Sequence, residues 1–422
     1  MGSQRRLLIA NRGEIALRII RTAQESGFHT VAIYPKDDEA SLHVRRADEA
    51  VRLSGVGPAA YLDIDEITSI AVATNCQMVH PGYGFLSESG SFVRSIEKTG
   101  IVFVGPTAEQ MELFGNKSAA CNYAREKTIP VLGSSATFKS CDEFVKLFEN
   151  SVPRKPHIIK AVSGGGGRGM RVVRIGDDIR KLWDQAEAEA LTAFGDGRLY
   201  AEEYCDVARH IEVQVVGDGQ GNVTHLWERD CSLQRRHQKL VEITPAPSLD
   251  SGLRKKLLDA AVSLATEVQY RGIGTFEFLV DVETSNYFFI EANPRLQVEH
   301  TITEEVLGLD LICIQFEIAL GRSLENLSLL TPPPIKGTAL QLRINAEKMN
   351  EDGKISSVGG VVSQFEPSAG PGVRVDTAAH NLYTMHPSFD SLLAKLIIYS
   401  HGSDQQKLLT KAGRVLSEFV ID

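Results

Sequence analysis

The sequence predicts an α/β protein that opens with a doubly wound, mostly parallel sheet and continues with antiparallel hairpins. Near the start, the apolar, strand-like residues 7–10 and 30–34 enclose a helical pattern. The alternation of strand and helix then continues to about residue 104. Beyond residue 150, strand-like runs are separated by short turns of glycine and polar residues, which is typical of hairpins.

The first hundred residues supply the doubly wound part. Residues 11–14 turn into a helix whose inward face would be Ile15, Ile19, Ile20 and Ala23. The elements expected next are a helix over residues 64–74, a strand at 78–79, a loop over 80–89 and a strand at 101–104. The Gly-rich dinucleotide fingerprint is absent after the first strand, so we expect neither a nicotinamide nor a flavin site there.

A small segment from about residue 131 to residue 204 contains a glycine-rich connection. Strands are expected at residues 157–162 and 170–175, and five of the seven residues 163–169 between them are glycine. Glycines leave backbone N–H groups free to wrap a phosphate chain. This is not a Walker loop, because no Gly-Lys-Ser/Thr follows and the loop joins two strands. We expect a lid that closes over a nucleotide, with a merely flexible hairpin as the alternative.

A basic run follows the next hairpin, which is expected at residues 210–216 and 223–228. Residues 229–239 hold five potential cations within an acidic protein. Such a cluster indicates an anion site, and a solvated basic loop is the alternative. A long amphipathic helix over residues 250–269 leads on to the most polar stretch.

That stretch, residues 290–300, reads IEANPRLQVEH. Its polar members fall on every second position, and they are Glu291, Asn293, Arg295, Gln297 and Glu299. An extended chain would place all five on one face, which would suit a divalent metal and an anion. A charged edge strand that discourages aggregation is the alternative.

A hairpin leads into this stretch and pairs two acids. Residues 274–280 and 287–290 flank a turn-like segment at 281–286. If the loop has an odd length, Glu277 and Glu291 lie on the same face, where like charges repel. A Mg²⁺ ion that also holds substrate phosphates would remove this repulsion.

The last hundred residues begin with a proline-rich linker at residues 331–334 and then alternate like a strand over residues 338–347. Leu340, Leu342 and Ile344 would share one face, and Gln341, Arg343 and Asn345 the other. Further strands are expected at residues 361–365 and 373–376, before a closing helix.

Composition narrows the functional class. The net charge of −9 argues against general nucleic-acid binding, and no apolar run is long enough to span a membrane. Six scattered cysteines without a CxxC pair indicate neither disulfides nor a zinc site. We therefore expect a protein of a reducing compartment, the cytoplasm, or the mitochondrion if a transit peptide has been removed.

Five motifs together resemble one family. LLIANRGEIALRIIR, HPGYGFLSE, GGGGRGM, ERDCSLQRRHQK and EANPRLQVEHTITE occur in the order found in biotin carboxylase, and the similarity runs from about Leu7 to Asp422. The resemblance implies an ATP-grasp fold with a Rossmann-like start, a small mobile lid and a mixed α/β C-terminal part. The implied units are an N-terminal domain (1–106), a helical linker (107–130), the lid (131–205), the ATP-grasp C-terminal subdomain with the active site (206–332) and the biotin carboxylase C-terminal subdomain (333–422).

The resemblance also implies roles for residues at matching positions. Phosphate contacts would come from Lys117, Lys160 and His237, and the lid clamp from Gly164, Gly165, Gly166 and Gly167 beside Met170. The adenine hinge would be Glu202, Glu203, Tyr204 and Cys205, with His210 and Gln234 around the nucleotide. Mg²⁺ or Mn²⁺ would be held by Glu277, Glu291 and Asn293. Bicarbonate would meet Lys239, Arg295, Gln297 and the Val298 amide with Glu299 as base, and biotin would meet Arg343 and Tyr83.

The implied reaction is the ATP- and bicarbonate-dependent carboxylation of biotin on a carrier domain, by way of carboxyphosphate. The implied partners are that carrier domain, a carboxyltransferase domain of a parent protein and a second copy of the chain. The alternatives are another ATP-grasp ligase, such as a carbamoyl-phosphate-synthetase-like enzyme, and a catalytically silent nucleotide-binding fragment. The resemblance implies that the carboxyltransferase domain chooses the final carboxyl acceptor, an acyl-CoA, pyruvate or urea.

Overall fold

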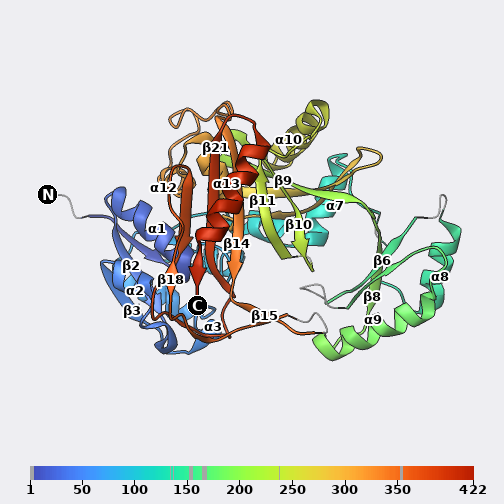
Figure 1. Ribbon diagram of the computed structural model, residues 1–422, viewed down its shortest axis with the longest axis horizontal. Helices are drawn as coiled ribbons and strands as arrows, with labels where there is room; N and C mark the ends of the chain where they lie inside the picture. The colour runs from blue at the N-terminus through green and yellow to red at the C-terminus, as the bar shows by residue number, and fades with distance from the viewer. Residues whose placement is uncertain are drawn as a thin grey trace.

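The computed structural model describes residues 4–133, 135, 137–151, 155–163, 169–236, 238–351 and 355–422. Figure 1 shows a large body made of the N-terminal and C-terminal parts, with a smaller unit standing apart at the right. The calls on Gly164, Gly165, Gly166, Gly167 and His237 lie outside the described residues.

The N-terminal part is a parallel sheet flanked by helices, as the alternation predicted. Its strands are β1 (Arg6–Ile9), β2 (His29–Tyr34), β3 (Glu49–Arg52), β4 (Met78–His80) and β5 (Val102–Phe103), in the order β3-β2-β1-β4-β5. The helices are α1 (Gly13–Glu25), α2 (Leu42–Arg46), α3 (Gly57–Ala60), α4 (Ile64–Ala73) and α5 (Gly90–Lys98), with a 3₁₀ turn η1 (Lys36–Asp38). The inward face predicted for α1 is confirmed, because Ile15, Ile19, Ile20 and Ala23 are all buried.

Two helices, α6 (Ala108–Phe114) and α7 (Lys117–Glu126), lead to the smaller unit. That unit holds a three-stranded sheet of β6 (His157–Ala161), β7 (Met170–Val173) and β8 (Leu199–Glu203), with β6 in the middle. Helices α8 (Cys141–Asn150) and α9 (Ile179–Phe194) pack on this sheet (Figure 1). Phe144, Phe148 and Trp183 are the largest buried side chains of its separate core.

The main sheet is antiparallel and has eight strands. In spatial order they are β13 (Tyr287–Asn293), β12 (Arg271–Asp281), β9 (Ala208–Asp218), β10 (Val223–Arg235), β11 (Gln238–Thr244), β14 (Gly337–Asn345), β21 (Leu392–His401) and β19 (Val373–Thr377). Helix α10 (Ser251–Thr266) packs its leucines on one face against Ile211, Val213 and Phe276. Helix α11 (His300–Leu307) packs near β14 and β21, so the alternate polar residues of the strands meet between the sheet and α11.

The glutamates of the hairpin β12–β13 do lie on one face, for a reason that differs from the predicted one. Val280 pairs with Tyr287 across a loop of even length, residues 281–286, which alone would have put Glu277 and Glu291 out of register. An irregularity between Glu277 and Phe278 shifts the register and pairs Glu277 with Glu291. Paired residues of an antiparallel ladder point to the same side.

The expectation that residues 290–300 form one extended strand is wrong. Strand β13 ends at Asn293, and α11 already begins at His300. Pro294 has no N–H to continue the ladder, and the Arg295 amide instead turns back to the Asn293 carbonyl at 2.8 Å. The polar side chains are therefore brought together by a folded loop and not by strand alternation.

The basic run is not a solvated loop over its described residues. It continues β10 to Arg235, turns at Arg236 with φ +50°, and enters β11 at Gln238. Arg229 is completely buried, whereas Arg236 is exposed, so the cations occupy very different environments.

The C-terminal part adds short strands and two helices to the body. These are α12 (Leu311–Ala319), β15 (Glu347–Met349), β16 (Ile355–Ser357), β17 (Gly360–Val361), β18 (Phe365–Glu366), β20 (Thr384–Met385), α13 (Gln405–Glu418) and β22 (Val420–Ile421). The strand expected at residues 361–365 is wrong, because β17 and β18 are separate pieces that pair with β20 and β22. Within the described residues, no helix has both the length and the apolar character needed to cross a membrane.

Candidate active site

Two adjoining cavities lie between the main sheet, the N-terminal part and the smaller unit. The first, of about 640 Å³, is lined by residues of the N-terminal part, the main sheet and the segment 388–392. The second, of about 650 Å³, lies towards the smaller unit. They share His210, Gln234 and Glu291, among others, so they form one continuous site. We call the first the catalytic cavity and the second the nucleotide cavity, after the roles that the sequence analysis predicts for their residues.

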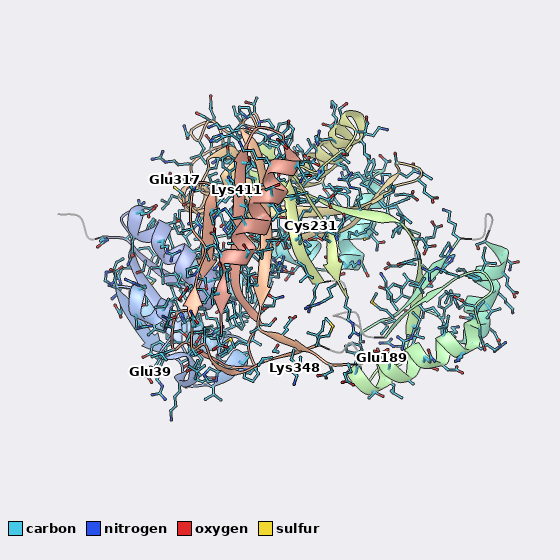
Figure 2. All side chains as sticks on the ribbon, in the orientation of Figure 1. Glu39, Glu189, Cys231, Glu317, Lys348 and Lys411 are labelled. Carbon is cyan, nitrogen blue, oxygen red and sulfur yellow. The ribbon has the colours of Figure 1, made fainter. Side chains whose placement is uncertain are left out.

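Every predicted site residue that the structure describes lines one of these cavities. Those in the catalytic cavity are Tyr83, His210, Gln234, Lys239, Glu277, Glu291, Asn293, Arg295, Gln297, Val298, Glu299 and Arg343. Those in the nucleotide cavity are Lys117, Lys160, Met170, Glu202, Glu203, Tyr204, Cys205, His210, Gln234 and Glu291. Figure 2 labels Glu189 on the smaller unit and Cys231 in the body.

Lys239 joins three acids in the catalytic cavity. Its Nζ donates to Glu212 at 2.5 Å, to Glu299 at 2.8 Å and to Glu277 at 3.1 Å. Burial alone would lower the Lys239 pKa, but these carboxylates raise it well above its usual value. Lys239 is therefore charged at neutral pH. It links Glu277 of the hairpin to Glu299, which lies next to α11.

Glu299 is ionised although it is buried. Burial alone would raise its pKa, but Lys239, Arg343 and Arg229 together hold the pKa well below the usual value of a glutamate. It accepts a hydrogen bond from Lys239 on one oxygen and from Arg343 on the other. An ionised carboxylate at the wall of a cavity can accept a proton from a bound acid.

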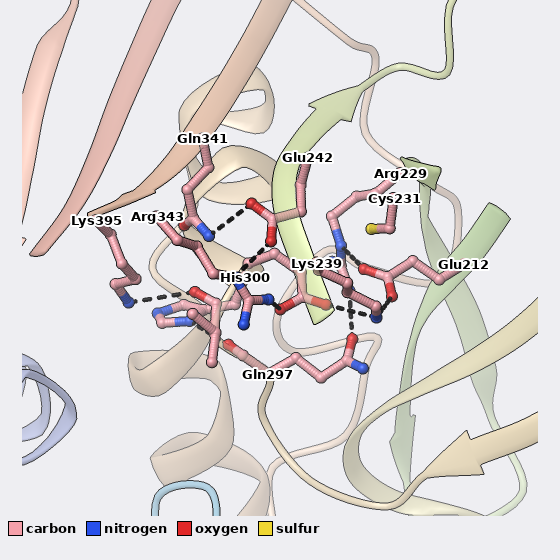
Figure 3. A network of polar contacts seen from close by, with 12 residues as sticks. Glu212, Arg229, Cys231, Lys239, Glu242, Gln297, His300, Gln341, Arg343 and Lys395 are labelled. Carbon is pink, nitrogen blue, oxygen red and sulfur yellow. Dashed lines mark hydrogen bonds and ion pairs between the residues drawn. The ribbon is translucent and has the colours of Figure 1, made fainter. Parts of the chain in front are cut away.

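Arg343 bridges two glutamates. Its Nε donates to Glu242 at 2.6 Å (Figure 3). Its Nη2 donates to Glu299 at 2.9 Å. Glu242 is completely buried, and its second oxygen accepts from Gln341 Nε2 at 3.0 Å. Burial raises the pKa of Glu242 to about 7, although Arg343 acts in the opposite direction. Glu242 does not line the cavity, so it acts on the site through the orientation of Arg343.

Arg229 is the buried centre of a second group of contacts. Its five N–H groups reach Gln214, Thr275, Gln297, Thr303 and Glu212 (Figure 3 shows Glu212 and Gln297). Because Arg229 donates to Gln297 Oε1 at 2.9 Å, the Gln297 amide nitrogen is left to donate to Glu277 at 2.8 Å. Through its bond to Gln297, Arg229 thus orients the loop between β13 and α11.

One arginine and three glutamates lie side by side in a row across four strands of the main sheet. Arg229, Glu212, Glu277 and Glu291 are consecutive cross-strand partners on β10, β9, β12 and β13. Burial together with the neighbouring Glu277 raises the pKa of Glu291, whereas Lys239 and His210 hold that of Glu277 below its usual value. Glu291 forms a long ion pair with Lys117, whose Nζ lies 3.8 Å from the carboxylate. The oxygen donors of this pair, with Asn293 beside them, fit a hard divalent cation.

Two lysines and the residues predicted to form an adenine hinge line the nucleotide cavity. Lys160 on β6 forms an ion pair with Glu202 on β8, the strand next to it. Burial lowers the Lys160 pKa, Glu202 opposes this, and Lys117 adds to the lowering. Lys117 is the first residue of α7, and its side chain is half-exposed to the cavity. Two such ammonium groups at one cavity wall suit a polyphosphate.

Sequence reasoning did not assign roles to Glu212 and Glu242, and it placed Arg229 only among the cations of the basic run. The signal was present, since Glu212 and Glu242 are single acids within the apolar runs of β9 and β11.

The six cysteines are free, and Cys231, completely buried, has a pKa raised well above its usual value by burial. Cys231 is therefore a structural thiol.

Comparisons with known proteins identify relatives of the whole chain. The models for the biotin carboxylase N-terminal domain, the ATP binding domain of the carbamoyl-phosphate synthase L chain and the biotin carboxylase C-terminal domain match residues 3–111, 116–327 and 341–422. Biotin carboxylase 1 of Bacillus subtilis is 42% identical over 423 residues, which cover 99% of this chain and 92% of that protein. Pyruvate carboxylase of Aspergillus niger is 45% identical over 425 residues, but the chain spans only 35% of its length.

A solved structure is similar in fold. It is the biotin carboxylase domain dimer of the Hydrogenobacter thermophilus 2-oxoglutarate carboxylase, in complex with MgADP, ADP and bicarbonate. The TM-score is 0.89 at 37% sequence identity, and the match covers 99% of this chain and 90% of that chain.

Proposed function

The chain belongs to the biotin carboxylase family, and on that premise we propose how its two cavities carry out the ATP-dependent carboxylation of biotin. The nucleotide cavity would take ATP, and the catalytic cavity would take bicarbonate and then biotin. The single observation that carries the proposal is the position of Lys239, which joins Glu277 of the metal-binding pair to the base Glu299.

Bicarbonate would bind as an anion next to Lys239 and Arg295. The loop between β13 and α11 contributes Gln297 and the Val298 amide, and both residues line the same cavity. A bound anion would offset the cations that depress the Glu299 pKa, so the carboxylate becomes a stronger base when its substrate arrives. Glu299 would then remove the bicarbonate proton while these groups hold the oxygen in line with the γ-phosphate of ATP.

Phosphoryl transfer would need charge neutralisation more than covalent help from the protein. Lys117 and Lys160 line the nucleotide cavity and would neutralise phosphate oxygens. Mg²⁺ or Mn²⁺, held by Glu277, Glu291 and Asn293, would supply Lewis-acid polarisation of the phosphates when bound. The hinge on β8 and just after it, from Glu202 to Cys205, would take the adenine ring, with Met170, His210 and Gln234 nearby.

Biotin would be carboxylated in the catalytic cavity. Attack of the bicarbonate oxygen on the γ-phosphorus forms a P–O bond and releases ADP, and the resulting carboxyphosphate breaks its C–O bond to give CO₂ and phosphate. Phosphate would take the ureido N1 proton of biotin, and N1 would then bond to CO₂. Arg343, held between Glu242 and Glu299, would stabilise the enolate-like ureido oxygen, and Tyr83 would contact the same substrate.

The wider setting is proposed by analogy with the relatives. Biotin would arrive on a carrier domain, and a carboxyltransferase domain of a larger protein would pass the carboxyl group on. The H. thermophilus domain is a dimer, and we propose that this chain also forms a homodimer. The glycines Gly164, Gly165, Gly166 and Gly167 and also His237 stay predicted phosphate contacts.

The proposal is tested by measuring ADP release with bicarbonate present or absent, and with free biotin added. We expect ATP cleavage to require bicarbonate and to rise with biotin. Glu299→Gln and Lys239→Ala should each abolish the bicarbonate-dependent rate, while Glu228→Gln, at a buried glutamate outside both cavities, should keep it. Equal ATP cleavage with and without bicarbonate would show that the reaction class is wrong.

A further inference from the structure

A buried lysine next to Arg343 has no part in the chemistry described above. Lys395 lies on β21, and its side chain is completely buried. It is the cross-strand partner of Arg343 on β14 and of Asp376 on β19, so all three side chains point to the same side of the main sheet. A lysine is almost never fully buried unless it is paired, because removing its charge from water is costly. The contacts of Lys395 therefore have to account for its position.

The Lys395 ammonium contacts three separate segments. Its Nζ donates to the Val298 carbonyl at 3.2 Å, in the loop between β13 and α11. It also forms an ion pair at 3.0 Å with Glu14, in the first turn of α1, and a longer one at 3.8 Å with Asp376. One side chain thus joins the N-terminal part, the main sheet and a loop that lines the catalytic cavity.

The two acids compensate the charge of Lys395 but do not explain its contact with the loop. Arg374 already donates to both oxygens of Asp376, at 3.0 and 2.8 Å. Burial raises the pKa of Asp376, but Lys395 and Arg374 lower it to about 2, so this acid is ionised. Within the described residues, neither oxygen of Glu14 accepts a hydrogen bond, which leaves its ion pair with Lys395. The acids therefore offset the cost of burying the ammonium while one of its N–H groups reaches Val298.

The bond to Val298 restrains the backbone directly before the predicted base. A peptide unit is planar, so the Val298 carbonyl and the Glu299 amide turn together. Fixing that carbonyl limits the directions in which the Glu299 side chain can leave the backbone. The preceding residue, Gln297, is already held by Arg229 at 2.9 Å. Because hydrogen bonds from charged donors are stronger than neutral ones, Lys395 provides a second firm anchor for the loop.

We propose that Lys395 is a positioning residue for bicarbonate, because its bond to the Val298 carbonyl sets the loop so that the Val298 amide and the Glu299 carboxylate face the same anion. This inference rests on the proposed function, since it concerns how the groups around bicarbonate are held. Loss of Lys395 should affect bicarbonate more than ATP, because no residue of the loop 294–299 lines the nucleotide cavity.

The alternative is a lysine that only ties α1 to the main sheet. Such a lysine would need Glu14 but not the loop, and its loss would weaken the fold without favouring one substrate over the other. The two roles therefore differ in the kinetics of the separate substrates.

The test measures bicarbonate-dependent ADP release while bicarbonate and ATP are varied in turn. Lys395→Met removes the donor but keeps a long side chain. We expect kcat/KM for bicarbonate to fall about tenfold or more and the KM for ATP to stay within about twofold. A second variant, Lys395→Met/Glu14→Gln, also removes the acid that would be left without a cation. It should show the same difference between the substrates, and it decides the test if the single variant does not fold.

The matched control is Asp376→Asn, which removes a buried charge next to Lys395 but leaves the bond to Val298. Asp376 lines neither cavity, and this variant should keep kcat/KM for bicarbonate within about twofold. The proposal is overturned if the Lys395 variants keep kcat/KM for bicarbonate, if both substrates are affected equally, or if Asp376→Asn has the same effect. It is also overturned if neither Lys395 variant folds, because the lysine then serves the fold as a whole. Failure of the proposed function is distinguishable, since the unaltered chain would then show no bicarbonate-dependent ADP release.

Discussion

Glu242→Gln should impair the biotin step while leaving phosphoryl transfer largely intact. The glutamate is completely buried and accepts a 2.6 Å hydrogen bond from Arg343 Nε. Glutamine keeps an acceptor for Arg343 but loses the negative charge. Hydrogen bonds that involve a charged group contribute about 1.5–3 kcal/mol. We take the upper end for the pair of charges and the lower end for the bond between Arg343 and a neutral glutamine. The difference of about 1–2 kcal/mol corresponds to a loss of about 5- to 30-fold.

The assay is the ratio of two rates measured on the same enzyme. The first is biotin-stimulated ADP release, which would need a well-oriented Arg343; the second is the bicarbonate-dependent release without biotin. We expect Glu242→Gln to lower the ratio by the factor above. Glu228→Gln is the matched control, because Glu228 is also completely buried and pairs with Arg254 away from both cavities. An unchanged ratio in Glu242→Gln, or an equal loss in Glu228→Gln, would refute the reasoning.

The same residue gives a pH dependence with a definite sign. Burial raises the Glu242 pKa to about 7, so its charge is present above that pH and is lost as the pH falls through it. The rate ratio of the unaltered chain should therefore decrease as the pH is lowered from about 8 to about 6. Because both rates use the same bicarbonate, its own titration cancels in the ratio. Glu242→Gln should show a flat ratio over this range, and a slope equal to that of the unaltered chain would contradict the assignment.

Three further predictions follow from the contacts of the site. Lys239→Met should lower bicarbonate-dependent ADP release at saturating ATP about 100- to 1000-fold, since it removes a cation from the reacting groups. A loss under about threefold would count against the proposed role of Lys239. Glu291→Gln should raise the Mg²⁺ concentration needed for half-maximal rate about tenfold. Glu283→Gln, in the exposed turn of the same hairpin, should leave that concentration unchanged. An equal shift in the two variants would contradict the assignment of Glu291 as a metal ligand. Arg229→Met should lower the free energy of unfolding by about 3–5 kcal/mol in urea titrations, because Glu212 loses a buried partner. A change under about 1 kcal/mol would show that the ion pair is not needed for stability.

Local periodicity explains the parts of the fold that could be predicted from the sequence. The alternation in residues 338–347 put Gln341 and Arg343 on a polar face and Leu340 on an apolar face. The structure has this arrangement, since Gln341 and Arg343 reach Glu242 and Leu340 is buried. Side-chain direction along one strand depends only on the strand's own residues, so it is visible in a short segment.

Register and loop shape depend on more than one segment. The pairing of Glu277 with Glu291 was predicted from an odd loop, but it arises from an even loop and an irregularity in the ladder. Gln297 and Glu299 were expected on a strand, and they reach the site from a loop whose backbone is held by the hydrogen bond between His300 and the Gln297 carbonyl. Neither feature has a simple periodic signal.

Residues that act through partners far along the chain were the hardest to assign. Glu212 reads as one acid in an apolar strand, and its meaning depends on Arg229 and Lys239 from two other strands. Glu242 likewise depends on Arg343, which is about a hundred residues away. Resemblance to a family supplied the cavity-lining residues but not these supporting ones, because no motif linked them to a substrate.

The measurement that tests the central claim most directly follows the oxygen of bicarbonate. The chain is supplied with ATP, Mg²⁺, biotin and ¹⁸O-labelled bicarbonate, and the phosphate product is examined by mass spectrometry. If the bicarbonate oxygen attacks the γ-phosphorus, each phosphate molecule should carry one ¹⁸O atom. Phosphate with no more ¹⁸O than the solvent supplies would contradict the proposed attack, and with it the roles of Lys239 and Glu299.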